Sequence, residues 1–274
     1  MQRAVVDGVG LLGEFAGEVR FAFTERTGGV SQPPFCSLNL GTHVGDDPGA
    51  VLENRRRALG ALMGVDRGHL LCPDEMLDRL LVPNQVHGDH VVVLRSDNAC
   101  EIARAREEAA AGADAIVCTS AGVPVMLCFA DCVPVVLVAP HGFAVIHSGW
   151  KGTYRRIAAK AARALMEETG SDPSSLKAYI GPHILEDEYE VSEELISQFA
   201  EEFHWDDLGG SRMLNMTRAI AQALMAEGIP LQHIEDLHYS TVRENDRFFS
   251  YRAEGGQTGR HAALAYMSGE RTAS

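Results

Sequence analysis

The region between residues 115 and 146 constrains the fold of this chain more than any other. It holds four short apolar segments rich in β-branched residues, and Gly, Pro or Asp separates each from the next. A transmembrane helix needs about 20 largely uninterrupted apolar residues, whereas Asp131, Pro134 and Pro140 interrupt this region. Short apolar segments divided in this way are typical of buried strands. We predict strands at Ala115–Cys118, Val123–Phe129, Val133–Val138 and Phe143–Ile146.

The same pattern predicts strands elsewhere in the chain. They lie at Val19–Thr24, Arg79–Val82, His90–Arg95, Leu176–Ile180, His233–Tyr239, Phe248–Tyr251 and His261–Tyr266. Many strands follow one another without an intervening helix, which argues against a Rossmann sheet. The pattern therefore predicts an α+β fold in which mixed β-sheets are flanked by helices. No long linker divides the chain, so we expect a single domain over residues 1–274.

Capping residues mark the expected helices. Asp47 followed by Pro48 is typical of a helix start, and Ser192 precedes two glutamates in a similar way. Gly170 and Gly228 mark helix ends. We expect helices from Asp47 to about Met63 and at Thr153–Thr169, Ser192–Phe203 and Leu214–Glu227, with a short helix or surface excursion at Glu101–Gly112.

The net charge limits the partners of the protein. The 274 residues contain 24 Lys and Arg against 38 Asp and Glu, which gives a charge of −14. A chain this acidic is a poor binder of nucleic acids and of anionic membranes, and we expect neither as a partner. If the protein handles an anion such as phosphate, the positive potential has to be local.

Cysteine usage and the first residues bear on the cellular compartment. The six cysteines are irregularly spaced and form no Cys-x-x-Cys motif. A chain of this length buries a sufficient core without disulfides. Residues 1–17 include Asp7 and Glu14 and lack a long apolar run, which is unlike a signal peptide. We therefore expect reduced thiols and a cytoplasmic protein.

Three loops place metal-capable side chains beside strand ends. They are Asn84–Gly88 with His87, Ala130–Cys132 with Cys132, and His147–Gly152 with His147. Two imidazoles and a thiolate form a ligand set that zinc accepts, with a fourth position open for water or substrate. Bound zinc would lower the pKa of that water to about 7. The separations of 45 and 15 residues match no short metal motif, so each residue could equally be an ordinary core residue.

The same loops resemble the signature segments of the bacterial laccase-domain family. The resemblance rests on Asn-Gln-Val-His-Gly (84–88), Ala-Asp-Cys (130–132) and His-Ser-Gly-Trp-Lys-Gly (147–152). It extends in the same order over nearly the whole chain, through residues 24–31, 37–41, 54–55, 180–182, 189–191, 248–252 and 258–260. This family is also called the polyphenol oxidase or multicopper-oxidase-like family, and its members are understood as purine nucleoside phosphorylases.

The resemblance implies both a metal and an activity. It implies a zinc ion held by residues matching His87, Cys132 and His147, and a single α+β unit of mixed sheets flanked by helices. It also implies phosphorolysis of purine nucleosides such as adenosine, inosine and guanosine. Some members also phosphorolyse methylthioadenosine and deaminate adenosine. We expect purine nucleoside and phosphate as ligands, and a monomer or small homo-oligomer.

Further residues are candidates for the site. Asp131 is expected to act as an acid or base, or to support the metal, although capping its turn is an equal alternative. The candidates for substrate binding are Arg26, Asn39, Gln85, Lys151 and His183. Arg26 lies in a glycine-rich loop that either cradles phosphate or forms an ordinary surface turn. Arg252 and Arg260 flank another such loop and either bind an anion or pair with acidic groups.

Three other functions stay open at this point. A Cys–His₂ set resembles a blue-copper centre, which favours a copper-dependent polyphenol oxidase (laccase). However, the 11 histidines include no His-x-His pair, the usual sign of a trinuclear copper cluster. A cysteine hydrolase would use Cys132 as its nucleophile. A binding domain that retains the metal without catalysis is the third alternative.

Overall fold

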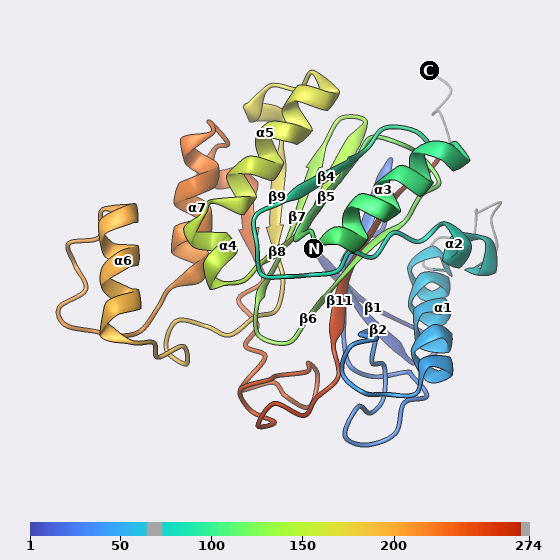
Figure 1. Cartoon of the computed structure of the whole chain (residues 1–274), viewed down its shortest axis with the longest axis horizontal. Helices are drawn as coiled ribbons and strands as arrows, with labels where there is room; N and C mark the ends of the chain where they lie inside the picture. The colour runs from blue at the N-terminus through green and yellow to red at the C-terminus, as the bar shows by residue number, and fades with distance from the viewer. Residues whose placement is uncertain (65–72, 270–274) are drawn as a thin grey trace.

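The computed structural model describes residues 1–64 and 73–269, and two β-sheets lie at its centre (Figure 1). The order of strands is β1-β2-β3-β11-β6 in the five-stranded sheet and β10-β9-β7-β8-β5-β4 in the six-stranded sheet. Helices cover the outer faces of both sheets. The predicted α+β fold with mixed sheets is therefore confirmed.

The five-stranded sheet is antiparallel throughout. Its strands are β1 (Gln2–Val6), β2 (Val9–Glu14), β3 (Val19–Thr24), β6 (Val125–Phe129) and β11 (His261–Met267). The hairpin of β1 and β2 was not among the predicted strands. Asp7 and Gly8 form its turn, and both have positive φ (50° and 85°), as an Asp-Gly hairpin turn requires.

The six-stranded sheet is mixed. Its strands are β4 (Val91–Leu94), β5 (Ala115–Cys118), β7 (Val133–Ala139), β8 (Gly142–Ser148), β9 (Lys177–Ile180) and β10 (Ile234–Asp236). The two outer pairs, β4 with β5 and β9 with β10, are parallel, and the three inner pairs are antiparallel. The apolar segments between residues 115 and 146 supply three of its four inner strands, and these are buried as predicted.

The helices and sheets enclose three cores. The helices are α1 (Pro48–Gly64), α2 (Pro73–Arg79), α3 (Ala99–Ala111), α4 (Trp150–Tyr154), α5 (Ile157–Thr169), α6 (Glu193–Phe203) and α7 (Met216–Ala226), with 3₁₀ turns at Pro173–Ser175 and Leu231–His233. One core lies between the six-stranded sheet and α5, α6 and α7. A second fills the space between the two sheets and beneath α3, and the third lies under α1 and α2. Among the described residues, no helix combines the length and apolar character needed to cross a membrane.

The predicted caps are present, but one predicted helix is broken. Ser192 accepts a hydrogen bond from the Leu195 amide (3.2 Å), and Asp47 accepts one from Ala50 (2.8 Å). The helix predicted over residues 153–169 is instead divided into α4 and α5. Arg156 adopts a left-handed conformation (φ 59°, ψ 43°) between them, and its guanidinium binds Glu202 at 2.8 Å.

Three predicted strands were wrong in whole or in part. Residues 79–82 contain the end of α2, and only Leu81 forms an isolated bridge to β6. Residues 233–239 contribute only the three residues of β10. Residues 248–251 form no strand and are largely irregular, although Phe248 is fully buried. Side chains rather than a neighbouring strand bind the local backbone: Asn245 donates to the Phe248 carbonyl, and Glu254 accepts from the Ser250 amide. The five described cysteines form no disulfide, and Cys72 lies outside the described residues.

Candidate active site

All three predicted ligand loops lie along the edge of the six-stranded sheet that is formed by the start of β5, the start of β7 and the end of β8. The antiparallel register pairs Val133, at the start of β7, with Ser148, at the end of β8. The start of β5 lies beside the same end of β8, because Ala115 pairs with Ile146. The start of β4 is parallel to β5, which brings the preceding loop 84–90 to this edge as well. Segments separated by up to 60 residues therefore meet at one place.

His87, Cys132 and His147 converge at this edge. Their ligand atoms all lie within 4.8 Å of one another, and they are the only group of this kind among residues 1–64 and 73–269. The two imidazole rings meet edge to face at a centroid distance of 4.8 Å. His147 is buried, Cys132 is half-buried and His87 is exposed. These three side chains would hold a metal from one side and would leave a further position open to a ligand from the solvent side.

Asp114 holds the group in place, and sequence reasoning missed it. It precedes β5, and its fully buried carboxylate accepts a hydrogen bond from His147 Nδ1 at 2.7 Å. The same carboxylate accepts the backbone N–H groups of Val86, His87 and Gly88 at 3.2, 3.0 and 2.6 Å. One side chain thus orients one ligand and the loop that carries another. A bond at Nδ1 leaves Nε2 of His147 free to bind a metal, as is common for metal-binding histidines.

The electrostatics of the group favour a thiolate at Cys132 and a protonated imidazole at His147, which would have to release its Nε2 proton to bind a metal. Burial would raise the pKa of Cys132, but His147 and His87 outweigh burial and lower it to about 6. Burial would lower the pKa of His147, but the Cys132 thiolate and the Asp114 carboxylate raise it to about 9. The thiolate, which is the form of cysteine that binds metals, is therefore favoured at neutral pH.

Two glycines in the predicted loop 147–152 allow this close packing. A Cβ at Gly149 would lie 2.9 Å from His87 Cδ2 and 3.4 Å from Cys132 Sγ. A Cβ at Gly152 would lie 2.7 Å from the Gly88 carbonyl oxygen. The glycines therefore let α4 begin directly beside the ligands.

Asp131 lies beside the ligands but is held by hydrogen bonds. It has a positive φ of 89°, and its carboxylate accepts the Thr241 hydroxyl and the Arg252 amide, each at 2.7 Å. Its carbonyl accepts the Ile184 amide at 3.0 Å. These bonds tie the C-terminal segments to the turn that carries Cys132. Both carboxylate oxygens of Asp131 are therefore engaged in hydrogen bonds beside the ligand group.

A cavity of about 580 Å³ opens over the three ligands. Its lining includes the aromatic side chains of Phe129, Trp150, Tyr189 and Tyr251 and the guanidinium groups of Arg252 and Arg260. Burial raises the pKa of Tyr189 to about 12, so this phenol keeps its proton at neutral pH and can donate a hydrogen bond. The aromatic rings suit a planar substrate. The guanidinium groups and the His87–Cys132–His147 group suit polar and anionic parts of a substrate.

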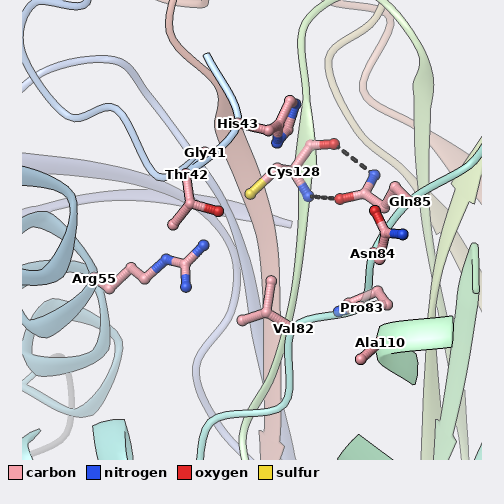
Figure 2. Close-up of a pocket in the computed structure, with 10 residues that line it drawn as sticks. All are labelled: Gly41, Thr42, His43, Arg55, Val82, Pro83, Asn84, Gln85, Ala110 and Cys128. Carbon is pink, nitrogen blue, oxygen red and sulfur yellow. Dashed lines mark hydrogen bonds between the residues drawn. The ribbon is translucent and has the colours of Figure 1, made fainter. Parts of the chain in front are cut away.

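A second cavity of about 420 Å³ adjoins the first (Figure 2). The two share His43, Gln85 and Cys128 in their linings. In Figure 2, Arg55 from α1 extends toward this space, and dashed lines join Gln85 to the backbone of Cys128. These bonds are 2.8 Å in both directions, so the Gln85 amide fastens its loop to β6.

The structure brings some of the predicted residues to the cavities and places the others elsewhere. Asp131, Gln85 and the three ligand candidates line the larger cavity. The residues that line neither of these cavities are Arg26, Asn39, Lys151 and His183. Arg26 pairs with Glu254 at 3.1 Å, and the amide of Asn39 is bonded within its own loop and to Asp46.

The other two residues also have different surroundings. The Nζ of Lys151 lies 5.4 Å from the centroid of the Trp150 ring, and its side chain is exposed. His183 is buried, and its ring bonds the Gly181 carbonyl at 2.8 Å and the Thr217 hydroxyl at 2.9 Å. Direct substrate contact by these four residues stays a prediction.

Several residues of the cavity walls were not predicted as site residues. They are His43, Arg55, Tyr189 and Tyr251, whereas Arg252 and Arg260 had been noted with two alternative roles. Arg55 belongs to the segment 54–55, which resembles the laccase-domain family. This resemblance is the only feature of the sequence that pointed to Arg55. The tertiary structure alone brings these residues to the ligand loops.

Comparisons with known proteins identify the relatives of this chain. The sequence model of the family described as multi-copper polyphenol oxidoreductase laccase matches residues 20–268. A purine nucleoside phosphorylase of Corynebacterium glutamicum is 34% identical over 257 residues, which are 92% of this chain and 96% of that protein. A protein of an unidentified prokaryote named adenosine deaminase is 32% identical over 249 residues, which are 87% of this chain and 90% of that protein.

A solved structure shares the fold. The purine nucleoside phosphorylase YlmD of Geobacillus stearothermophilus is 34% identical over 259 residues, 91% of this chain and 90% of that protein. Its crystal structure superposes with a TM-score of 0.78 and 30% identity, covering 92% of this chain and 93% of that chain. The resemblance expected from the sequence is thus confirmed, and the chain belongs to the laccase-domain family of enzymes.

Proposed function

We propose that the protein is a zinc-dependent purine nucleoside phosphorylase that converts adenosine, inosine or guanosine and phosphate into the free base and ribose 1-phosphate. One observation carries the proposal. The group of His87, Cys132 and His147 lies in the wall of a cavity that also presents aromatic rings and arginines. The names of two relatives, both purine nucleoside phosphorylases, support the same activity.

The donor set fits zinc. Nitrogen and thiolate ligands within 4.8 Å of one another suit a tetrahedral site with an open fourth position, because atoms bound to one zinc lie about 3–4 Å apart. Copper would find the same three donors, but a laccase needs several copper sites. Among the described residues there is only one such group. Bound zinc would act as a Lewis acid and would lower the pKa of a coordinated water.

The chain's own residues provide the remaining requirements of phosphorolysis. We infer that Trp150, Tyr189 and Tyr251 stack on or border the planar purine, since such rings provide the apolar faces of the cavity. The departing purine needs a hydrogen bond or a proton at its ring nitrogen, and the phenol of Tyr189, which is protonated at neutral pH, is one hydrogen-bond donor in the cavity wall. Arginine side chains attract the phosphate and stabilise negative charge during the transfer.

The proposed role of Asp131 is positional. Both of its oxygens already accept hydrogen bonds, from Thr241 and from the Arg252 amide. Asp131 thereby holds the cavity wall that carries Tyr251 and Arg252 against the turn that carries Cys132. The acid or base role predicted for it from sequence is the less favoured alternative.

Adenosine deamination is a second candidate activity at the same site. A relative at 32% identity bears that name. Deamination requires a water molecule directed at C6 of adenine, and zinc deaminases of other folds use a metal-bound water. Phosphorolysis of methylthioadenosine would need only that the ribose 5′ position lie toward open solvent.

Three further proposals concern the domain organisation, the cellular compartment and the oligomeric state. We propose a single domain, because both sheets contribute to the cavity: Phe129 belongs to the five-stranded sheet and His147 to the six-stranded sheet. We propose the cytoplasm as the compartment, because a thiol ligand has to stay reduced. A monomer or small homo-oligomer is compatible with a site whose three ligand candidates come from one chain.

The test combines metal analysis with product analysis. Purified protein is assayed for bound zinc and copper, and adenosine or inosine is incubated with and without phosphate before chromatography. We expect about one zinc per chain and release of base and ribose 1-phosphate only when phosphate is present. Cys132→Ala should lose both zinc and phosphorolysis, whereas Cys100→Ala, at an exposed cysteine, should retain both.

The other outcomes separate the alternatives. Full phosphorolysis by zinc-free Cys132→Ala would disprove the metal-dependent function. Copper together with phenol oxidation would instead indicate a polyphenol oxidase. Hydrolysis that persists in metal-free wild type and disappears in Cys132→Ala would indicate a cysteine hydrolase. Stoichiometric zinc without any turnover would indicate a binding domain.

A further inference from the structure

Three consecutive arginines on α1 differ in their partners. Arg56 and Arg57 both pair with Glu53, at 2.8 and 2.7 Å. Arg55 has no carboxylate within 4.0 Å among the described residues, although it is only partly exposed. It lines the smaller cavity, whereas Arg56 and Arg57 do not. The helix therefore directs one cation without a carboxylate partner toward the site, whereas its two neighbours share the Glu53 carboxylate outside it.

The backbone carbonyl of Leu40 fixes the Arg55 guanidinium. Nε and Nη2 of Arg55 donate to the Leu40 oxygen at 3.0 and 2.9 Å. Nη1 has no carbonyl or carboxylate acceptor among the described residues. The guanidinium also has a hydrogen bond with the Cys128 side chain, whose thiol stays neutral because burial raises its pKa. The guanidinium is thus oriented in advance, with donor capacity left for a ligand.

Arg260 reaches the same loop from the other side. Its backbone carbonyl accepts the Leu40 amide at 2.9 Å, and its Nη1 donates to the Thr258 and Gly259 carbonyls at 2.9 Å. A Cβ at Gly41 would lie 2.7 Å from Arg260 Cγ, so glycine at this position leaves room for the Arg260 side chain. No carboxylate lies within 4.0 Å of Arg260 in residues 1–64 and 73–269, and burial lowers its pKa, as expected for an unpaired guanidinium.

His43 links the two arginines. It lines both cavities, and Arg260 and Arg55 are both close enough to help burial lower its pKa. Two half-buried guanidinium groups without carboxylate partners are unusual in a chain with a net charge of −14, where acidic groups outnumber basic ones. Such a charge imbalance is stable when an anion completes it.

We propose that the phosphate substrate binds where the two cavities meet, between Arg55 and Arg260 with His43 beside it. The inference rests on the proposed function and specifies where one of the two substrates binds. The nucleoside then occupies the larger cavity over the metal ligands, and phosphate enters through the smaller one. Both reactants meet in one continuous space, and the arginines hold the anion against the overall negative charge.

The test measures phosphate and nucleoside separately. Wild type, Arg55→Gln, Arg260→Gln and the control Arg56→Gln are compared by titration calorimetry with inorganic phosphate and by phosphorolysis kinetics. Loss of one charge-assisted hydrogen-bond donor should raise the Kd and the KM for phosphate about 10- to 100-fold in the two site variants. The KM for nucleoside should change less than about threefold, and Arg56→Gln should match wild type because Arg56 lies outside both cavities.

Failure of the site and failure of the function give different results. Normal phosphate binding in both Arg55→Gln and Arg260→Gln would overturn the site even if phosphorolysis is confirmed. Wild type that binds phosphate but cleaves no nucleoside, with binding lost in both variants, would support the site and overturn the proposed function. Arg55→Lys keeps the charge and should restore part of the phosphate affinity, so a folding defect in Arg55→Gln does not decide the test.

Discussion

The Asp114 carboxylate offers the sharpest test of how the site is built. Asp114→Asn preserves the shape of the side chain and changes only its hydrogen bonding. One carboxylate oxygen accepts from His87 N and His147 Nδ1, and the other accepts from Val86 N and Gly88 N. An asparagine has one acceptor oxygen, so it can serve one pair of donors only. Its NH₂ group then faces the donors of the other pair.

The expected cost follows from these four bonds. Two hydrogen bonds to a charged acceptor are lost, each worth about 1.5–3 kcal/mol, and two buried donors lose their partner. The free energy of unfolding should fall by about 3–6 kcal/mol in the metal-free protein. Because His147 also loses its orienting partner or the His87 loop loses its anchor, zinc affinity should fall about 10- to 100-fold.

Two measurements check this prediction. Urea unfolding in the presence of a chelator reports the stability of the metal-free protein, and competition with a chromophoric chelator reports the zinc affinity. Asp89→Asn is the matched control, because Asp89 lies in the same loop as His87 but binds Arg155 and Lys160 at the surface. It should change stability by less than about 1 kcal/mol and leave zinc binding unchanged. Wild-type zinc affinity and stability in Asp114→Asn would refute the role assigned to this carboxylate.

Three other predictions concern the ligand group and the core. Gly149→Ala should weaken zinc binding about tenfold without changing a ligand, because its Cβ would lie 2.9 Å from His87 Cδ2, whereas Gly60→Ala should not. Burial lowers the pKa of His261 to about 3, so protons bind the unfolded state preferentially below pH 6.5. Stability should therefore fall by about 2 kcal/mol more between pH 7 and 5 in wild type than in His261→Leu, as measured by urea unfolding; equal losses would contradict this. Chelation should lower the thermal midpoint of zinc-loaded protein, and added zinc should restore it, whereas Cys132→Ala should show neither change.

Local patterns in the sequence determined most elements of the fold. The apolar segments at 115–118 and 133–138 became buried strands, because short β-branched segments have few other stable environments. Ser192 begins α6 as predicted, since capping is a local interaction between a side chain and a nearby amide. The ligand candidates His87, Cys132 and His147 were also identified from short segments, and the structure brings them within 4.8 Å of one another.

Only the tertiary structure decided features that depend on distant partners. The break at Arg156 is accompanied by a contact with Glu202, and residues 248–251 are largely irregular although their pattern is strand-like. Asp114 looks like any acidic residue before a strand until the register of β5 and β8 places it beside His147. No local pattern specifies such contacts, because they depend on which segments become neighbours after folding.

The division between the two levels has one physical basis. Periodicity and capping act within a few residues, so the sequence alone determined most of the buried strands, the capped helix starts at Asp47 and Ser192, and the residue types suited to a metal. The arrangement of charge acts through space. Whether Arg55 faces a cavity or a carboxylate depends on which way α1 turns its side chains after packing against the five-stranded sheet. Only the folded molecule therefore decided that Arg56 and Arg57 share the Glu53 carboxylate while Arg55 lines a cavity.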